Sequence, residues 1–169
     1  RLGYGLMSPA CDLTIQELAS LCDVFYIGGT KCGALFGEAV VITNDKLKKD
    51  FRYSIKRHGG MLAKGRLLGV QFLTLMEDGL YFDICKQAVA YALEIRKAFE
   101  AKGVEMYGTS MTNQQFPILS EAQMKHFDGK FAYEYWGRYD DSHHIVRFCT
   151  SWATKQENMD ALLAAIKDM

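Results

Sequence analysis

The sequence lacks the features that would assign it to several large classes of protein. Its 169 residues include only 2 prolines, and 20 basic residues balance 20 acidic ones. No apolar run approaches the roughly 20 residues that span a bilayer. A net charge of zero, with no clustered basic and aromatic stripe, gives no electrostatic reason to expect a nucleic acid or an anionic membrane as partner. With 12% aromatic residues, a globular chain is expected rather than a disordered one.

Paired cysteine motifs are missing as well. The five cysteines are scattered, without a C-x-x-C pair and without ligand-like spacing to the four histidines: Cys11, Cys22, Cys32, Cys85 and Cys149. Because a zinc site needs clustered ligands, we expect no metal site. An odd, scattered set predicts reduced and mostly buried thiols, which are typical of a cytoplasmic protein.

The first 57 residues alternate between helix and strand patterns. The segments are a capped helix from Thr14 to about Asp23, strands at 24–27 and 38–43, a glycine-rich turn at 28–33 and a helix from about Asn44 to Arg57. The first strand is a compact apolar run, so we expect it to be buried. The chain starts at Arg1 rather than at a methionine, and its opening residues are typical of the end of a longer element, so we expect a fragment.

Two helical patterns follow, and short strands come after them. Residues 65–80 are apolar almost all round, which predicts a buried helix with a kink at Gly79, and residues 81–102 carry a strong apolar stripe that Gly103 ends. Beyond it, the candidates are strands at 104–107, 115–119, 131–136 and 145–149, capping boxes at Ser120–Gln123 and Thr154–Glu157, and a final helix. The pattern therefore predicts an α/β part at 1–57, a helical connector at 58–102 and a small α+β layer at 103–169.

Lys31 lies in the glycine-rich turn directly after an apolar strand. Desolvation at the edge of a sheet core favours a neutral amine, and a neutral amine can form a Schiff base. From the spacing alone, a solvated turn lysine is the more common case. A phosphate-binding loop is excluded, because it needs Gly-Lys-[Ser/Thr], whereas the order here is Gly29-Thr30-Lys31-Cys32.

Four segments, in order and spacing, resemble the threonine aldolase and β-eliminating lyase family, whose members are pyridoxal-phosphate enzymes. They are Arg1-Leu-Gly-Tyr-Gly5, the segment from Asp23 to Glu38, Arg57-His-Gly-Gly-Met-Leu-Ala-Lys-Gly65 and Val146-Arg-Phe-Cys-Thr-Ser-Trp152. The resemblance covers nearly the whole chain but corresponds to the C-terminal half of the family's proteins. It implies an α/β fold: the C-terminal part of a pyridoxal-phosphate transferase-like large domain (1–57), the connector (58–102) and a small α+β C-terminal domain (103–169).

The resemblance also implies roles for individual residues. Lys31 matches the lysine that binds pyridoxal 5'-phosphate covalently. Arg1 and Arg147 match residues that hold the substrate carboxylate, for which the planar fork of arginine is well suited. Thr30, Arg57 and Lys64 match the cofactor-binding side, with the last two able to reach a phosphate in a neighbouring subunit. From the residues alone, a solvated basic face is the more common case for that pair.

The implied activity is aldol cleavage of threonine or another 3-hydroxy amino acid to glycine and an aldehyde, by a cytoplasmic homodimer or homotetramer acting on amino-acid substrates. Two alternatives stay open: a β-eliminating lyase on the same scaffold, and a degenerate member that binds without turnover. The sequence also departs from the family pattern. The residues expected to pair with the cofactor ring nitrogen, to cradle its phosphate and to stack on its ring are not in this chain, which we therefore expect to be inactive alone. His143 and His144 are expected to be loop or hydrogen-bonding residues.

Overall fold

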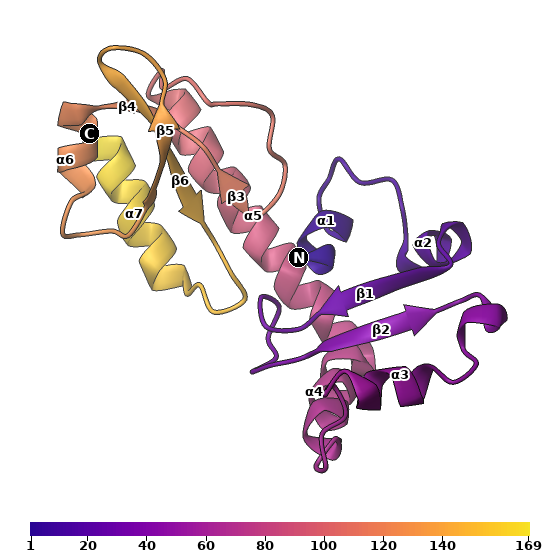
Figure 1. Ribbon diagram of the computed structural model, residues 1–169. Helices are drawn as coiled ribbons and strands as arrows, with labels where there is room; N and C mark the ends of the chain where they lie inside the picture. The colour runs from indigo at the N-terminus through magenta and orange to yellow at the C-terminus, as the bar shows by residue number, and fades with distance from the viewer.

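A long helix, α5 (Leu80–Ala101), joins two regions of the molecule (Figure 1). The computed structural model describes all residues from 1 to 169. The N-terminal region contains α1 (Leu2–Leu6), α2 (Ile15–Leu21), β1 (Val24–Gly28), β2 (Glu38–Ile42), η1 (Asp45–Leu47), α3 (Phe51–Arg57), α4 (Arg66–Met76) and η2 (Glu77–Gly79). The C-terminal region contains β3 (Gln114–Gln115), β4 (Ile118–Ser120), α6 (Glu121–Phe127), β5 (Glu134–Arg138), β6 (His143–Cys149) and α7 (Gln156–Asp168). None of the helices has the length and apolar character needed to cross a membrane.

In the N-terminal region, β1 and β2 form an antiparallel pair in which Val24 faces Ile42 and Gly28 faces Glu38. The predicted capping box of α2 is confirmed, because Thr14 accepts from the Glu17 amide and the Glu17 carboxylate accepts from Thr14. Both predicted strands are also confirmed, but the expected burial of the first is wrong. Its side chains alternate, and Tyr26 is 64% exposed. One face of this hairpin is therefore open, as is usual for an antiparallel sheet.

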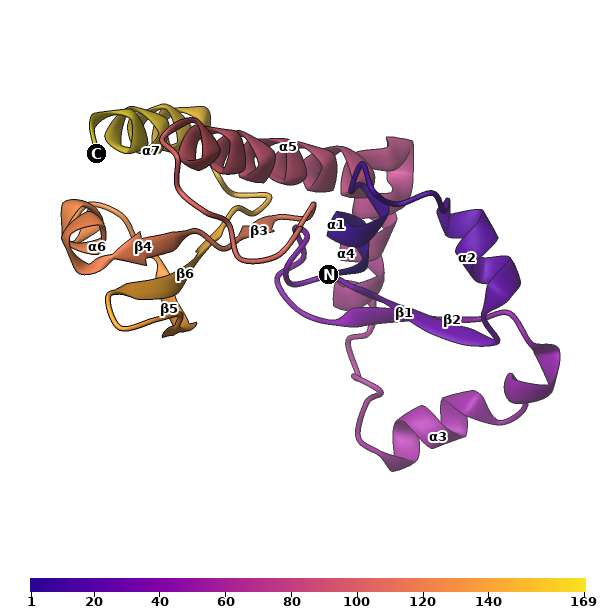
Figure 2. The same cartoon turned by 90° about the horizontal axis from the view of Figure 1, so that it is seen from above.

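The helices after β2 differ from the sequence-based prediction. The continuous helix expected from Asn44 to Arg57 is divided into η1 and α3, because Asp50 adopts a left-handed conformation with φ of 57°. The apolar helix α4 was expected to be buried, yet among its residues only Leu75 is buried, and Leu73 is 65% exposed. The kink expected at Gly79 is confirmed by a φ of 76° there. Figure 2 shows α3 projecting from the rest of the N-terminal region.

In the C-terminal region, β6 is the central strand. β3 and β4 pair antiparallel with successive parts of β6, and β5 also pairs antiparallel with it. The strand expected at 104–107 is reduced to one bridge between Met106 and Pro117. The capping box at Ser120 is confirmed, whereas the one at Thr154 is wrong, because Thr154 Oγ1 accepts from the Ser151 amide instead.

Two separate cores lie along α5, whose apolar stripe is buried as predicted. The C-terminal core packs α5 against β4, β6, α6 and α7 around Phe99, Leu119, Phe127 and Val146. The N-terminal core packs α5 against α1, the end of β1 and the turn after it, around Tyr4, Cys32, Tyr81 and Cys85. The turn that carries Lys31 thus lies over the second core, at the side of the hairpin nearest to β6.

Candidate functional site

The turn between β1 and β2 places Lys31 at a cavity between the two regions. The predicted position of Lys31, on a turn between two paired strands, is confirmed. The cavity has a volume of about 350 Å³, within the ordinary range of ligand pockets. Its lining comes from α1, the Lys31 turn and β6 with its neighbours: Arg1, Tyr4, Lys31, Asn113, Ala132, Tyr133, Glu134, Arg147, Cys149, Thr150 and Ser151. The structure therefore brings together the lysine and both arginines that the sequence singles out.

Lys31 is an exposed residue within this cavity. The desolvation expected from a position at the edge of a sheet core is therefore not found. The physical reason is the turn geometry: the backbone of residues 29–34 folds back on itself through bonds from the amides of Cys32 and Ala34 to the Gly29 carbonyl. Cys32 and Ala34 are buried by this fold, while Lys31, directly before Cys32, remains accessible.

Arg147 is held in place on β6 by three neighbours. Its Nη2 is paired with the carboxylate of Glu134, which faces it across the β5–β6 ladder. Its Nη1 donates to Gln114 Oε1 over 2.9 Å. Its guanidinium carbon lies 5.0 Å from the ring centroid of Trp136, a cation–π distance. With 17% of its side chain exposed, the guanidinium is mostly desolvated and oriented before any ligand arrives.

The charges that line the cavity are unequal. Arg1, Lys31 and Arg147 carry positive charge, and Glu134 is the one carboxylate among the lining residues. Since a partly enclosed site strengthens electrostatic interactions relative to water, this set favours an anionic ligand. A carboxylate that replaced Glu134 on Arg147 would find the same fork of donors already oriented.

Two buried polar atoms in the cavity lining have no partner within the protein, namely Asn113 Oδ1 and Arg147 Nε. The amide nitrogen of Asn113 is committed to the Thr150 carbonyl at 2.7 Å, so its oxygen remains an unused acceptor. An unpaired buried polar atom is costly, but both atoms lie behind the cavity surface, so neither is within reach of a ligand until the lining side chains move. The primary amine of Lys31 in the same cavity fits the aldehyde of a carbonyl cofactor.

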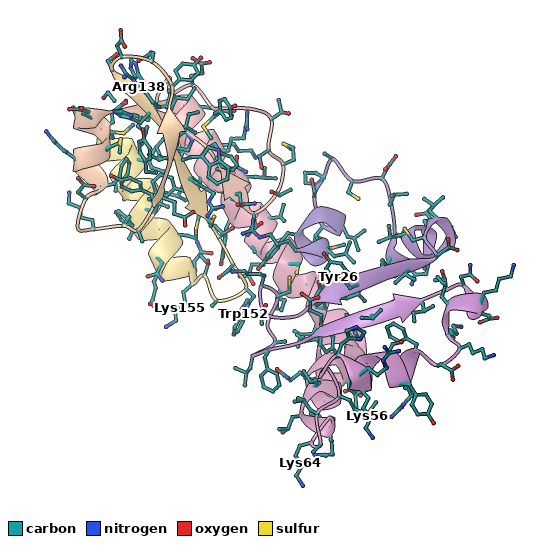
Figure 3. All side chains as sticks on the ribbon, viewed as in Figure 1. Tyr26, Lys56, Lys64, Arg138, Trp152 and Lys155 are labelled. Atoms are coloured by element: carbon teal, nitrogen blue, oxygen red, sulfur yellow. The ribbon has the colours of Figure 1, made fainter.

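The remaining predicted cofactor residues lie elsewhere. Thr30 is exposed beside Lys31 but does not line the cavity, and Arg57 is the exposed last residue of α3. Lys64 precedes α4 and extends from the end of the N-terminal region far from the chain start (Figure 3). The structure therefore brings Lys31 and the two arginines together within one chain, but not the residues predicted to hold the phosphate.

No histidine lines the cavity. His143 Nδ1 lies 3.0 Å from the carboxylate of Asp140, and the His144 ring packs at a tilt against Tyr135, with ring centroids 5.6 Å apart. All five cysteines are free thiols, but only Cys32 and Cys85 are fully buried, so the expectation of mostly buried thiols is wrong. Cys149 is exposed at the cavity because β6 ends there. Nowhere do three or more His, Cys, Asp or Glu side chains gather into a possible metal-binding group.

Sequence reasoning missed Tyr4, Asn113 and Glu134. Tyr4 is three residues after Arg1, but a five-residue helix gives no periodic signal. Glu134 faces Arg147 only because the β5–β6 register shifts between Tyr135 and Gly137, and such a bulge is not visible in the sequence pattern. Asn113 lies in an irregular segment, where nothing in the sequence marks it.

Comparison with known proteins extends these observations. No protein-family model matches the chain. The chain is 30% identical over 148 residues to a low-specificity L-threonine aldolase of a Pseudomonas species, and 28% identical over the same length to that of Pseudomonas aeruginosa. Each match covers 86% of this chain and 41% of the relative.

Solved structures agree with the sequence matches. The threonine aldolase of Leishmania major superposes on 99% of this chain with a TM-score of 0.94 at 39% identity, and the match covers 49% of that protein. The serine palmitoyltransferase of Sphingomonas wittichii shares the fold alone, with a TM-score of 0.62 at 10% identity. The chain thus spans about half the length of the proteins it matches. Sequence and structure together confirm its resemblance to the threonine aldolase family, and its fold is that of the pyridoxal-phosphate-dependent transferase-like enzymes.

Proposed function

We propose that this chain carries part of the active site of a pyridoxal-phosphate-dependent lyase that cleaves threonine or another 3-hydroxy amino acid to glycine and an aldehyde. The convergence of Lys31, Arg1 and Arg147 on one cavity is the observation that carries the proposal. The similarity to threonine aldolases over 86% of the chain supports the reaction class.

Lys31 is the residue we assign to covalent attachment of the cofactor. Its primary amine is accessible in the cavity, which suits condensation with an aldehyde. When bound, pyridoxal phosphate supplies an electron sink for the pair released when a bond at the substrate Cα breaks.

Arg147 and Arg1 are assigned to the substrate carboxylate. The carboxylate displaces Glu134 from Arg147, while Gln114 and the Trp136 ring keep the guanidinium in place. Glu134 is 64% exposed on its side chain, so it can move into solvent at little cost. A carboxylate fixed at two points restricts rotation about the substrate Cα, and this restriction decides which bond is aligned for cleavage.

Thr30, Arg57 and Lys64 remain our proposed cofactor-binding residues on the phosphate side. Because Arg57 and Lys64 lie outside the cavity of their own chain, we propose that the protein is a homodimer or homotetramer in which they reach a neighbouring site. A monomeric mass by light scattering of the natural protein would contradict this assembly. The five free thiols support a cytoplasmic location.

Substitution of Lys31 in the natural protein that contains this sequence tests the proposal. Lys31→Ala should abolish the visible absorbance of the lysine-bound cofactor and the release of acetaldehyde from threonine. Lys31→Arg should do the same, since a guanidinium stays protonated. Lys56→Ala is the matched control, because it removes an exposed lysine of α3 that does not line the cavity, and it should leave the absorbance band in place. A Lys31→Ala protein that keeps its activity would refute the assignment.

The products decide between the proposed function and its alternatives. Aldol cleavage of threonine gives glycine and acetaldehyde, β-elimination gives a 2-oxo acid and ammonia, and a non-catalytic member gives neither. We also expect the 169-residue chain alone to be inactive, because its cavity lacks the phosphate-binding groups. Threonine cleavage by this chain alone would contradict that expectation.

A further inference from the structure

Two buried tyrosine hydroxyls bind the backbone of the turn that carries Lys31, one at Lys31 itself and one at Gly28, where the turn begins. Tyr4, on α1, donates a hydrogen bond to the carbonyl oxygen of Lys31 itself. Tyr81, in the first turn of α5, donates over 3.2 Å to the carbonyl oxygen of Gly28, the last residue of β1. Tyr4 is 2% exposed and Tyr81 is 0% exposed, so water does not compete for either bond.

The Tyr81 hydroxyl makes a second bond, which ties α1 to the end of β1. It accepts from the Gly3 amide over 3.2 Å. That amide lies in the first turn of α1, where a helix offers no carbonyl partner. Because α1 begins directly after Arg1, the two hydroxyls together connect the segments that carry Arg1 and Lys31.

Close packing around the two hydroxyls depends on glycines. A Cβ at Gly3 would lie 2.5 Å from Cys85 Sγ and 2.7 Å from Tyr81 Cε1. A Cβ at Gly29, inside the turn, would lie 2.7 Å from the Ala34 Cβ. A side chain at Gly3 would therefore push Tyr81 away from both of its backbone partners.

The tyrosines remain hydrogen-bond donors across the physiological range. Burial raises the pKa of Tyr4 and of Tyr81 above the ordinary value of 10.0, so neither hydroxyl ionises near neutral pH. The neighbouring Cys85 thiol is only a weak donor and cannot replace them.

We propose that Tyr4 and Tyr81 form a hydroxyl clamp that positions the Lys31 amine and the Arg1 guanidinium toward the same cavity. The clamp matters for catalysis only if Lys31 binds the cofactor, so this inference rests on the proposed function. Tyr4 also lines the cavity, so it is the member closest to the ligand. Both tyrosines act through the backbone of the turn, where small displacements of a reacting group are costly.

Amide hydrogen exchange in the cofactor-free natural protein tests the clamp without any catalytic step. Tyr4→Phe and Tyr81→Phe keep the rings and remove only the hydroxyls. Each should accelerate exchange of the Cys32 and Ala34 amides by roughly threefold to tenfold, the factor for loss of one hydrogen bond. Gly3→Ala should have the same effect as Tyr81→Phe. The amides of α7, in the other core, should keep their rates.

The matched control is Tyr91→Phe. Tyr91 is also buried on α5, and its hydroxyl donates to Gln156 over 3.0 Å, but it belongs to the C-terminal core. Its loss should leave exchange in the Lys31 turn unchanged. Unchanged exchange in both Tyr4→Phe and Tyr81→Phe would overturn the clamp, as would equal acceleration of the turn by Tyr91→Phe.

A second readout separates positioning from mere structural support. When pyridoxal phosphate is added to the cofactor-free protein, the visible band of the lysine-bound cofactor should appear more slowly in Tyr4→Phe than in wild type. Faster exchange with an unchanged rate of band appearance would overturn the positioning role. A wild-type protein that forms no band would contradict the proposed function instead, and the exchange result would still decide whether the clamp exists.

Discussion

The two regions along α5 differ in how completely they bury their apolar side chains. In residues 103–169, the large apolar side chains that remain exposed are all Tyr or Trp, whose polar tips can face water. In residues 1–80, many aliphatic side chains are exposed: Leu13, Leu21, Val24, Leu35, Val40, Leu47, Met61, Leu62, Leu67, Val70, Leu73 and Leu80. The C-terminal region thus completes its own core, whereas the N-terminal region presents apolar faces that this chain does not cover.

The difference also concerns how the functional groups are held. Arg147 lies on the central strand of a complete sheet, where packing around Phe148 and Val146 fixes the backbone. Lys31 lies on the turn of a two-stranded hairpin, a structure that is marginal by itself. The hydroxyl clamp and the glycine packing then determine the place of the lysine. We therefore expect substitutions in the C-terminal core to lower the stability of this chain strongly, and substitutions on the exposed apolar face of α4 to change it little.

The largest expected effect is on the C-terminal core. Phe99 is 0% exposed and packs against Phe127 and Phe148, with ring centroids 5.9 and 5.5 Å away. Phe99→Ala should lower the free energy of unfolding by about 3–5 kcal/mol, because it removes a large buried ring and leaves a cavity. Urea denaturation measures this loss. A loss of unfolding free energy below about 0.5 kcal/mol, as is usual for substitution of an exposed residue, would mean that this core is not complete.

Next in size is the effect of Arg147→Ala on catalysis by the natural protein. It should lower kcat/KM by an amount equivalent to about 2–4 kcal/mol of transition-state stabilisation, since the substrate carboxylate loses its charged partner. The visible band of the lysine-bound cofactor should persist, because this arginine contacts substrate and not cofactor. Arg147→Lys should recover only part of the loss, since a point charge cannot reproduce the fork. An unchanged kcat/KM in steady-state kinetics would contradict the role of Arg147 in substrate binding, while the assignment of Lys31 would stand.

A smaller effect is expected from Glu134→Gln. The Glu134 carboxylate competes with the substrate carboxylate for Arg147. Its neutralisation should lower KM for the amino acid by up to roughly fivefold, since a half-exposed ion pair is worth at most about 1 kcal/mol. Glu157→Gln is the control, because Glu157 is paired with Lys155 on the surface. A higher KM in Glu134→Gln would show that the carboxylate helps to bind the substrate.

The smallest effect on stability is expected at the exposed apolar face of α4. Leu73→Ala, at a residue 65% exposed, should change the unfolding free energy of the 169-residue chain by less than about 0.5 kcal/mol. The same substitution in the natural protein sharpens the comparison between the regions. A cost of several kcal/mol there, against little in the isolated chain, would show that this face of α4 is covered in the natural protein.

Local patterns predicted much of the fold because they rest on interactions between near neighbours. The apolar stripe of α5, the kink at Gly79 and the Thr14 capping box were all confirmed. The Thr154 box has the same sequence pattern, but its hydroxyl binds the Ser151 amide, so an adjacent turn competes for the same group. The prediction that α4 is buried was wrong for a different reason. An apolar sequence indicates that a helix has apolar faces to bury, but it does not indicate whether the same chain supplies the residues that cover them.

The site was partly predictable for the same reason. The turn that holds Lys31 is local, and its position was confirmed. The pairing of Arg147 with Glu134 depends on a bulge in β5, and the bonds of Tyr4 and Tyr81 to the turn join residues 27 and 53 positions apart. Contacts of this kind are set by tertiary packing, so residue patterns do not reveal them. The roles of Thr30, Arg57 and Lys64 stay predictions.

Chemical trapping of the cofactor tests the central claim most directly. Borohydride reduction of the natural protein loaded with pyridoxal phosphate, followed by proteolysis and mass spectrometry, identifies the lysine that holds the cofactor. The structure predicts a single labelled peptide that contains Lys31, with none at the exposed Lys56 or Lys64. A label on one of those lysines instead, or a loaded protein without a label at Lys31, would contradict the assignment of this cavity as the active site.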